Sequence, residues 1–166
     1  VVIPKPARSG GTVVAENHLL KLIEFGPFNG CLWYLAGPNE VTSYSQRVFG
    51  PMFEDHAGVV AKLTAKPGTE GNTKTLKKFD GANVELAAIG PKTTTNRQEA
   101  FIVFDEPDSY PPAFRSSFLD TGFQRGQMLG NLLKIYACSH PDMGWRGGIG
   151  QAWLSSTMGI LVMPCA

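Results

Sequence analysis

A chain of 166 residues with 43% hydrophobic and 17% charged residues has the size and composition of one globular domain. Its formal net charge of +1 argues against a surface devoted to nucleic acid or to an anionic membrane, and no apolar run reaches the roughly 18 residues of a membrane span. The 3 cysteines (Cys31, Cys138 and Cys165) have no CxxC spacing, which indicates buried thiols in a reducing compartment and not a disulfide framework.

Glycines and prolines punctuate the chain throughout. The 19 glycines and 12 prolines follow no period, and they separate short apolar runs. This spacing is typical of an all-β sandwich or barrel, in which many short strands alternate with tight turns.

The N-terminal part of the sequence predicts an arm followed by a first long element. Residues 1–11 (VVIPKPARSGG) contain two prolines and two basic residues and end in Gly-Gly, so we expect an extended N-terminal arm. Residues 12–25 begin with β-branched residues, which favours a strand. A helix is the open alternative, because Leu19, Leu22 and Ile23 also follow the i, i+3, i+4 spacing of a helical face.

Further strands are expected along the rest of the chain. Residues 31–36 (CLWYLA) form an apolar run between two Gly-Pro turns, and residues 59–66 alternate between apolar and polar side chains. The other expected elements are strands at 84–89, 100–104 and 152–163, a strand or short helix at 128–137, and a short helix at 112–120. About eight short strands within residues 12–166 predict one β-sandwich domain.

The strand at 100–104 ends in the most distinctive segment of the sequence. Phe104 is followed by Asp105-Glu106-Pro107-Asp108, which places two aspartates three positions apart in a turn stiffened by proline. Calcium binds about six to eight oxygens, so Asp105 and Asp108 are candidate metal ligands that supply part of a cage. The alternative is a solvated turn, in which Asp105 accepts hydrogen bonds from turn amides or caps the short helix that follows.

This turn and the C-terminal segment together resemble a virus coat protein. The two segments are FDEPDSYP at 104–111 and, at 150–164, a glycine followed by a long apolar stretch and a proline. Their order is similar to the shell domain of small icosahedral plant RNA viruses, of the sobemovirus and tombusvirus kind. The resemblance implies an eight-stranded jelly roll, with short helical turns in its loops, that self-assembles into a shell around single-stranded RNA. It also implies calcium binding by Asp105 and Asp108 between subunits, and a location in the virion and, during assembly, in the host cytoplasm.

A capsid function assigns roles to basic and aromatic side chains. Neutralising RNA phosphates requires many Lys and Arg residues, more than this chain contains. We therefore expect a basic arm before Val1. The basic candidates for RNA contact are Lys5, Arg8, Lys62, Lys66, Lys74, Lys77 and Lys78, and the alternative for each is a solvated strand edge. The candidates for contacts between subunits are Tyr110, Phe114, Phe118 and Trp145.

Two other classes of protein are alternatives to the capsid. One is a soluble β-sandwich module that binds carbohydrate or protein through Trp145 and the neighbouring loops. The other is an enzyme that uses Cys31 with one of the histidines (His18, His56, His140), but their spacing is not diagnostic of a catalytic or zinc site, and we expect no enzymatic activity. The glycine-rich segment 146–150 lacks a GK[ST] and a strand-to-helix context, so it predicts a turn and not a phosphate-binding loop.

Overall fold

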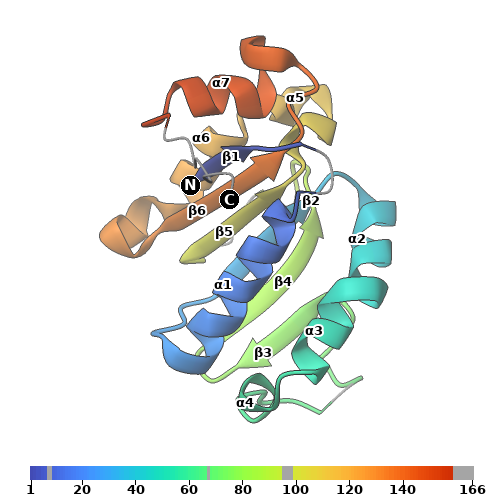
Figure 1. The fold of residues 1–166 in the computed structure, drawn as a ribbon. Coiled ribbons are helices and arrows are strands. Elements are labelled where there is room, and N and C mark those ends of the chain that lie inside the picture. Colours follow the sequence, from blue (N-terminus) through green and yellow to red (C-terminus); the bar gives the residue numbers. More distant parts are fainter. Residues whose placement is uncertain (7–8, 67, 95–98, 159–166) are drawn as a thin grey trace, which may run out of the picture.

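The computed structural model describes residues 1–6, 9–66, 68–94 and 99–158. Within these residues, one sheet of six strands carries helices on both faces (Figure 1). The strands are β1 (Val2–Pro4), β2 (Cys31–Leu35), β3 (Leu76–Phe79), β4 (Ala82–Ala88), β5 (Phe101–Asp105) and β6 (Lys134–Ser139). The helices are α1 (Gly11–Phe25), α2 (Pro38–Tyr44), the π-helix η1 (Ser45–Phe49), α3 (Gly50–Glu54), α4 (Ala57–Val60), α5 (Pro112–Arg115), α6 (Phe118–Gly126) and α7 (Gly148–Leu154). Short 3-10 helices are η2 (Pro107–Ser109), η3 (Gln127–Leu132) and η4 (Gly144–Arg146).

The sheet is mostly parallel. Its strand order is β1-β6-β5-β2-β4-β3, and only β3, which pairs with β4, is antiparallel within the described sheet. The carboxyl ends of β1, β6 and β5 therefore lie side by side at one edge, with Pro4 opposite Ser139 and Cys138 opposite Asp105. In open α/β sheets this edge is where ligands bind.

The predicted all-β jelly roll is wrong, because the apolar runs are the strands of a parallel sheet. Every residue of β2 and of β5 is buried. Trp33 and Val103 point into the core on one face, and Tyr34 and Phe104 point into the core on the other. Helices cover both faces, so these strands have no wet side and read as continuous apolar runs. A continuous apolar run also fits a strand in the core of a β-sandwich, so this pattern alone does not distinguish a jelly roll from a parallel sheet covered by helices.

Residues 12–25, predicted as a strand, form most of the helix α1, which crosses one face of the sheet (Figure 1). Ala15, Leu19 and Ile23 are buried at a four-residue spacing, and of the three residues that suggested a helical face, Leu19 and Ile23 are buried. The predicted strand at 59–66 is wrong as well, because it begins in α4 and continues as turns, with a single bridge from Leu63 to Phe79.

The opposite face of the sheet is covered by α6 and α7. Tyr110 and Phe118, predicted to contact neighbouring subunits, lie in this second core with exposed fractions of 0% and 1%. The Tyr110 hydroxyl donates a hydrogen bond of 2.9 Å to the Tyr34 carbonyl, and Phe118 packs edge-on against Phe104. Phe114 is partly buried against the same core. Tyr110 and Phe118 therefore hold helical segments to the sheet of this chain, and their contact with another subunit stays a prediction.

The expected arm, residues 1–11, supplies β1 at the edge of the sheet and the first residue of α1. Of the predicted last strand at 152–163, the described residues include the end of α7, and residues 159–163 lie outside them. No helix of the described residues is long and apolar enough to cross a membrane.

Candidate functional site

Four side chains meet where β1, β5 and β6 end and α1 begins. Lys5 directly follows β1, Asp105 is the last residue of β5 and Glu106 follows it, and Thr12 lies in the first turn of α1. Lys5 precedes Glu106 by 101 positions and Thr12 precedes Asp105 by 93, and the parallel strands β1, β5 and β6 bring them together because they end at the same edge of the sheet.

Asp105 is paired with Thr12. The Thr12 hydroxyl donates a hydrogen bond of 2.9 Å from Oγ1 to Asp105 Oδ1. The thiol of Cys138 donates to the same oxygen at 3.5 Å. Asp105 is only 6% exposed, and this burial raises its pKa to about 6 although both hydrogen bonds act to lower it. The carboxylate is therefore held in place while its charge lacks full compensation.

Glu106 is held on both of its oxygens. Oε1 accepts a hydrogen bond of 2.5 Å from Lys5 Nζ, and Oε2 accepts from Ser139 Oγ at 3.1 Å and from the His140 amide at 3.0 Å. Burial alone raises the pKa of Glu106, but the hydrogen bond from Lys5 and that from His140 outweigh it, so the pKa lies below the ordinary value. Glu106 is therefore ionised at neutral pH, and its hydrogen bonds fix the position of the carboxylate.

Lys5 is also buried. Its side chain is 8% exposed, and its burial, which lowers the pKa of a lysine, is outweighed by the hydrogen bond and the charge of Glu106, so the pKa is raised. The Lys5 backbone is fixed too, because its amide donates to the Ser139 carbonyl at 2.9 Å. The ammonium group is thus charged and positioned by the end of β6.

The start of α1 has the features of an anion site. Gly10 adopts φ +80°, which favours glycine, and a side chain at Gly11 would overlap the methylenes of Lys5. No described side chain caps the helix, and its first turn has no acidic residue. The free amides and the dipole at the N-terminus of a 15-residue helix attract negative charge.

Thr12 and the glycines before it match the end of the phosphate-binding motif G-x-x-x-x-G-K-[ST] in part. Gly10 and Thr12 stand at the motif's last glycine and its hydroxyl residue, and Gly11 stands where the motif has lysine. Lys5 fills the space beside Gly11 from the end of β1. Because the GK[ST] string is broken, this motif does not identify the loop from the sequence. Two features of the sequence were available as a signal. One is a glycine-rich turn and a threonine between a strand and a helix, and the other is an apolar run that ends in Asp-Glu.

Asp108, the second predicted metal ligand, has a different environment from Asp105. It is 4% exposed, and its Oδ1 accepts from the Ile149 amide at 2.6 Å while its Oδ2 accepts from the Met143 amide at 3.3 Å. It thus joins η2 to the loop before α7 and to the start of α7. The described residues contain no group of three or more His, Cys, Asp or Glu side chains that could hold a metal ion. Calcium binding by Asp105 and Asp108 stays a prediction.

Of the described basic candidates, Lys5 is the one that enters the site. Lys62 Nζ donates to the carbonyls of Ile23 and Glu24 at 2.8 and 2.7 Å, which satisfies the last turn of α1. Lys77 Nζ donates to Asn72 Oδ1 at 2.6 Å. The remaining described candidates are exposed: Lys66, Lys74 and Lys78. Arg8 lies outside the described residues.

Neither Cys31 nor Trp145 belongs to a set of hydrogen-bonded polar side chains like the one around Asp105 and Glu106 in the described residues. Cys31 is fully buried in β2, and this burial raises the pKa of its thiol well above the ordinary value. His18 packs edge-on against Phe101. Trp145 is 54% exposed in η4 and lies against Trp153, with ring centroids 5.3 Å apart.

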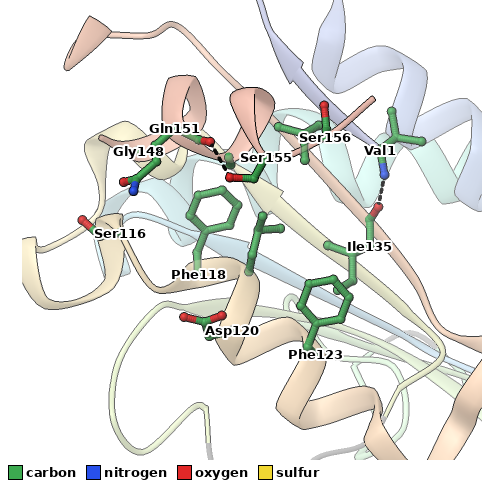
Figure 2. A pocket seen from close by; sticks show the side chains of 13 residues that line it. Val1, Ser116, Phe118, Asp120, Phe123, Ile135, Gly148, Gln151, Ser155 and Ser156 are labelled. Atoms are coloured by element: carbon green, nitrogen blue, oxygen red, sulfur yellow. Dashed lines mark hydrogen bonds between the residues drawn. The ribbon is translucent and has the colours of Figure 1, made fainter. Parts of the chain in front are cut away.

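A separate cavity of about 460 Å³ opens between α6, α7 and β1 (Figure 2). Figure 2 shows Phe118, Phe123 and Ile135 along it, with Gln151 and Ser155 of the α7 segment above. Neither Lys5, Thr12, Asp105 nor Glu106 is among its lining residues. The cavity therefore does not belong to the site at the carboxyl edge of the sheet.

Comparisons with known proteins give a family and a fold for the chain. The model of the family described as phage terminase large subunit gpA, ATPase domain, matches residues 1–166. The crystal structure of the HK97 bacteriophage large terminase has a similar fold, with a TM-score of 0.69 and 10% sequence identity over 92% of this chain. This chain spans 31% of the length of that terminase. A comparison with curated proteins finds no match.

These findings overturn the functional expectations from the sequence. The resemblance to plant-virus coat proteins is wrong, and so is the expectation of a self-assembling capsid shell around single-stranded RNA. The β-sandwich binding module is unsupported, because the fold is α/β. The expectation of no enzymatic activity is wrong too, since the matching family is one of ATPase domains. The expected cellular location stays a prediction.

Proposed function

Because the chain belongs to the family of phage terminase large subunit gpA ATPase domains, we propose that it binds ATP and hydrolyses it to ADP and phosphate at the carboxyl edge of the sheet. The hydrogen bond of 2.9 Å between Thr12 Oγ1 and Asp105 Oδ1 carries this proposal. In phosphate-binding-loop ATPases, a hydroxyl residue of the loop and an aspartate at the end of a buried strand together hold the magnesium ion that accompanies ATP. Thr12 and Asp105 occupy these two places.

The nucleotide phosphates fit against the start of α1. The amides of its first turn and the positive end of its dipole face this position, and Gly10 and Gly11 let a phosphate approach the backbone closely. Lys5 contributes the positive side chain. Its place at the end of β1 substitutes for the lysine that the usual motif has just before the threonine.

The donor set beside Thr12 fits a magnesium ion. A hydroxyl and a carboxylate are hard oxygen ligands, and magnesium in phosphate-transfer sites is bound by one or two carboxylates, with the remaining ligands coming from water and substrate phosphates. Thr12 and Asp105 would hold the ion, and a cation beside Asp105 would offset the burial that now raises its pKa to about 6. When bound, magnesium supplies charge that neutralises the phosphate oxygens as the bond breaks.

Glu106 is placed to act as the base. Glu106 directly follows Asp105 and is ionised at neutral pH, and we assign to its carboxylate the position beside the water that attacks the terminal phosphate. Water attacks the terminal phosphorus, the bond to the ADP oxygen breaks, and Glu106 accepts the proton that the water loses. Ser139 and the His140 amide hold the carboxylate in this orientation.

The hydrolysis is proposed to power the packaging of DNA into a phage shell. The family is that of a terminase large subunit, and the chain spans 31% of the HK97 large terminase. Within this chain, ATP binding and hydrolysis are assigned to Lys5, Thr12, Asp105 and Glu106. DNA, the portal and a small terminase subunit are the proposed partners of the motor as a whole.

The test is the release of phosphate from ATP by the full chain, with Asp105→Asn and Thr12→Ala compared with the wild type. Loss of a group that stabilises charge in the transition state costs about 100- to 1000-fold in rate, and we expect kcat to fall by at least about 100-fold in each variant. Asp80→Asn, which removes an exposed carboxylate in the turn between β3 and β4, is the matched control and should keep the wild-type rate. Unchanged hydrolysis in Asp105→Asn would contradict the proposal.

A further inference from the structure

Lys5 is committed to Glu106 in this structure, although ATP binding also requires it. The Lys5 Nζ to Glu106 Oε1 distance is 2.5 Å, and the lysine side chain is 8% exposed. The pair joins the proposed phosphate-binding lysine to the proposed base. Each group engages a partner that it must release before hydrolysis.

The carboxylate is fixed independently of Lys5. Ser139 Oγ and the His140 amide both donate to Oε2, which leaves Oε1 to Lys5. The backbone of Glu106 adopts φ +52°, an unfavourable region for a residue with a side chain. Ordered contacts therefore hold Glu106 at a specific place, and the departure of Lys5 would free one oxygen without displacing the other.

Lys5 has a second destination close by. Its side chain lies beside Gly11, over the first turn of α1, where the phosphates are proposed to bind. A phosphate carries more negative charge than a carboxylate and presents several acceptor oxygens, so it competes for the same ammonium group. Glu106 Oε1 and a phosphate oxygen are thus alternative partners of one cation.

We propose that Lys5 is shared between Glu106 and the nucleotide phosphates, so that the ion pair silences Glu106 in the empty site and phosphate binding releases Oε1 to accept a proton from water. This inference rests on the proposed function, because it assigns a regulation to that same site. Its consequence is that the base becomes available only when the substrate has taken the lysine. In the empty site, Oε1 is hydrogen-bonded to Lys5 and Oε2 to Ser139 and His140, so water finds no free oxygen on the carboxylate.

Sharing of Lys5 predicts an energetic penalty on nucleotide binding. The nucleotide must break the Lys5–Glu106 pair before it gains the lysine, so removing the competitor should tighten binding. General repulsion between Glu106 and the phosphates also weakens binding, but that effect does not require Lys5. A double-mutant cycle separates the two effects, since only the sharing of Lys5 appears as a coupling between the two positions.

The experiment measures by calorimetry the Kd of the magnesium complex of the β,γ-imido analogue of ATP for the full chain. Four proteins complete the cycle: wild type, Glu106→Gln, Lys5→Met and the double variant. We expect Glu106→Gln to tighten binding by about 3- to 10-fold when Lys5 is present, the range expected for a hydrogen-bonded pair at a partly exposed site. In the Lys5→Met background, the same substitution should change Kd by less than about 2-fold. Asp142→Asn, which removes an exposed carboxylate near His140, is the control for charge alone and should leave Kd unchanged.

The outcomes distinguish this inference from the proposed function. A wild-type chain that does not bind the analogue contradicts ATP binding itself. Binding that is equally tight in wild type and Glu106→Gln overturns the sharing of Lys5, and so does an equal gain in both backgrounds. Lys5→Gln replaces Lys5→Met if the latter does not fold, as shown by its thermal unfolding.

Discussion

The thiol of Cys138 and the carboxylate of Asp105 are direct neighbours across two parallel strands. The residues are register partners in β6 and β5, and Cys138 Sγ lies 3.5 Å from Asp105 Oδ1 as hydrogen-bond donor. Cys138 thereby belongs to the wall of the proposed magnesium position. Its burial raises the pKa of the thiol to about 12, and the charge of Asp105 acts in the same direction.

The first prediction is that Cys138 resists alkylation in the folded protein. Cys138 is 0% exposed, and at pH 8 a thiol of this pKa is ionised in about one molecule in ten thousand, so the reactive thiolate is scarce and inaccessible. We expect no modification by N-ethylmaleimide over an hour at neutral pH, read by mass spectrometry of the Cys138 peptide. The urea-unfolded chain, in which the peptide should react fully, is the control. Rapid modification of the native chain would show that the site is open.

The second prediction concerns the stability cost of Asp105. Its pKa is raised from 3.8 to about 6 on folding, so the ionised side chain destabilises the empty protein by about 3 kcal/mol at neutral pH. Because the folded pKa is the higher one, wild-type stability falls as the pH rises from about 4 to about 6 and is then level with respect to this group. Asp105→Asn can accept the same hydrogen bond from Thr12 without carrying the charge.

We therefore expect Asp105→Asn to be more stable than wild type by up to about 3 kcal/mol at pH 7.5, and the gain should disappear near pH 4. Urea unfolding of the nucleotide-free chain at pH 4, 6 and 7.5 measures the difference. At each pH the variant should have a kcat at least about 100-fold below that of the wild type. A stability gain that did not depend on pH would assign it to packing and not to charge.

The third prediction is that a methyl group at Gly11 weakens ATP binding. A methyl group at this position would overlap the Lys5 methylenes, which belong to a flexible side chain that can move aside. Gly11→Ala should therefore displace Lys5 from Glu106 and lower the free energy of unfolding by about 1–3 kcal/mol, the cost of losing a hydrogen bond between charged groups. It should raise the KM for ATP by about 10-fold or more, because Lys5 is displaced from the phosphates. Val14→Ala, at an exposed position of α1, is the control that should leave KM unchanged.

The fourth prediction is that Ser139 positions Glu106. Ser139 is 0% exposed, its hydroxyl donates to Glu106 Oε2, and the Asp108 amide donates to that hydroxyl at 3.3 Å. Ser139→Ala leaves a buried amide without this partner, which costs about 1–3 kcal/mol of stability. We expect kcat to fall by about 10-fold with KM nearly unchanged, because Glu106 loses its orientation and phosphate binding keeps Lys5. Steady-state kinetics and urea unfolding measure the two effects, and a rise in KM at constant kcat would reject the positioning role.

Part of this fold was predictable from the sequence. The apolar runs at 31–36 and 100–104 are strands, and the acidic turn that follows the second run lies at the candidate site. What the sequence left ambiguous was whether such strands are buried by a second sheet or by helices, because each arrangement covers both faces. The answer lay in residues 12–25, in which the spacing of Leu19 and Ile23 is helical and the β-branched start is not decisive.

The site itself was less accessible to sequence analysis. Thr12 and Asp105 are 93 positions apart, and only the parallel order of β1, β6 and β5 makes them neighbours. Lys5 lies six positions before the place at which a phosphate-loop lysine is expected, so a search for GK[ST] does not find it. Asp108 is the converse case, since its type and spacing suggested a ligand while its oxygens are taken by the Met143 and Ile149 amides.

The strand order also makes the end of β6 the link between the cation and the base of the site. Because β6 lies between β1 and β5, Lys5 and Glu106 have no direct strand pairing and are joined through the end of β6. Ser139 and His140 contact the backbone of Lys5 and the carboxylate of Glu106 together. The end of β6 is therefore the shared support of the cation and the base, and a change in the position of Ser139 or His140 acts on both.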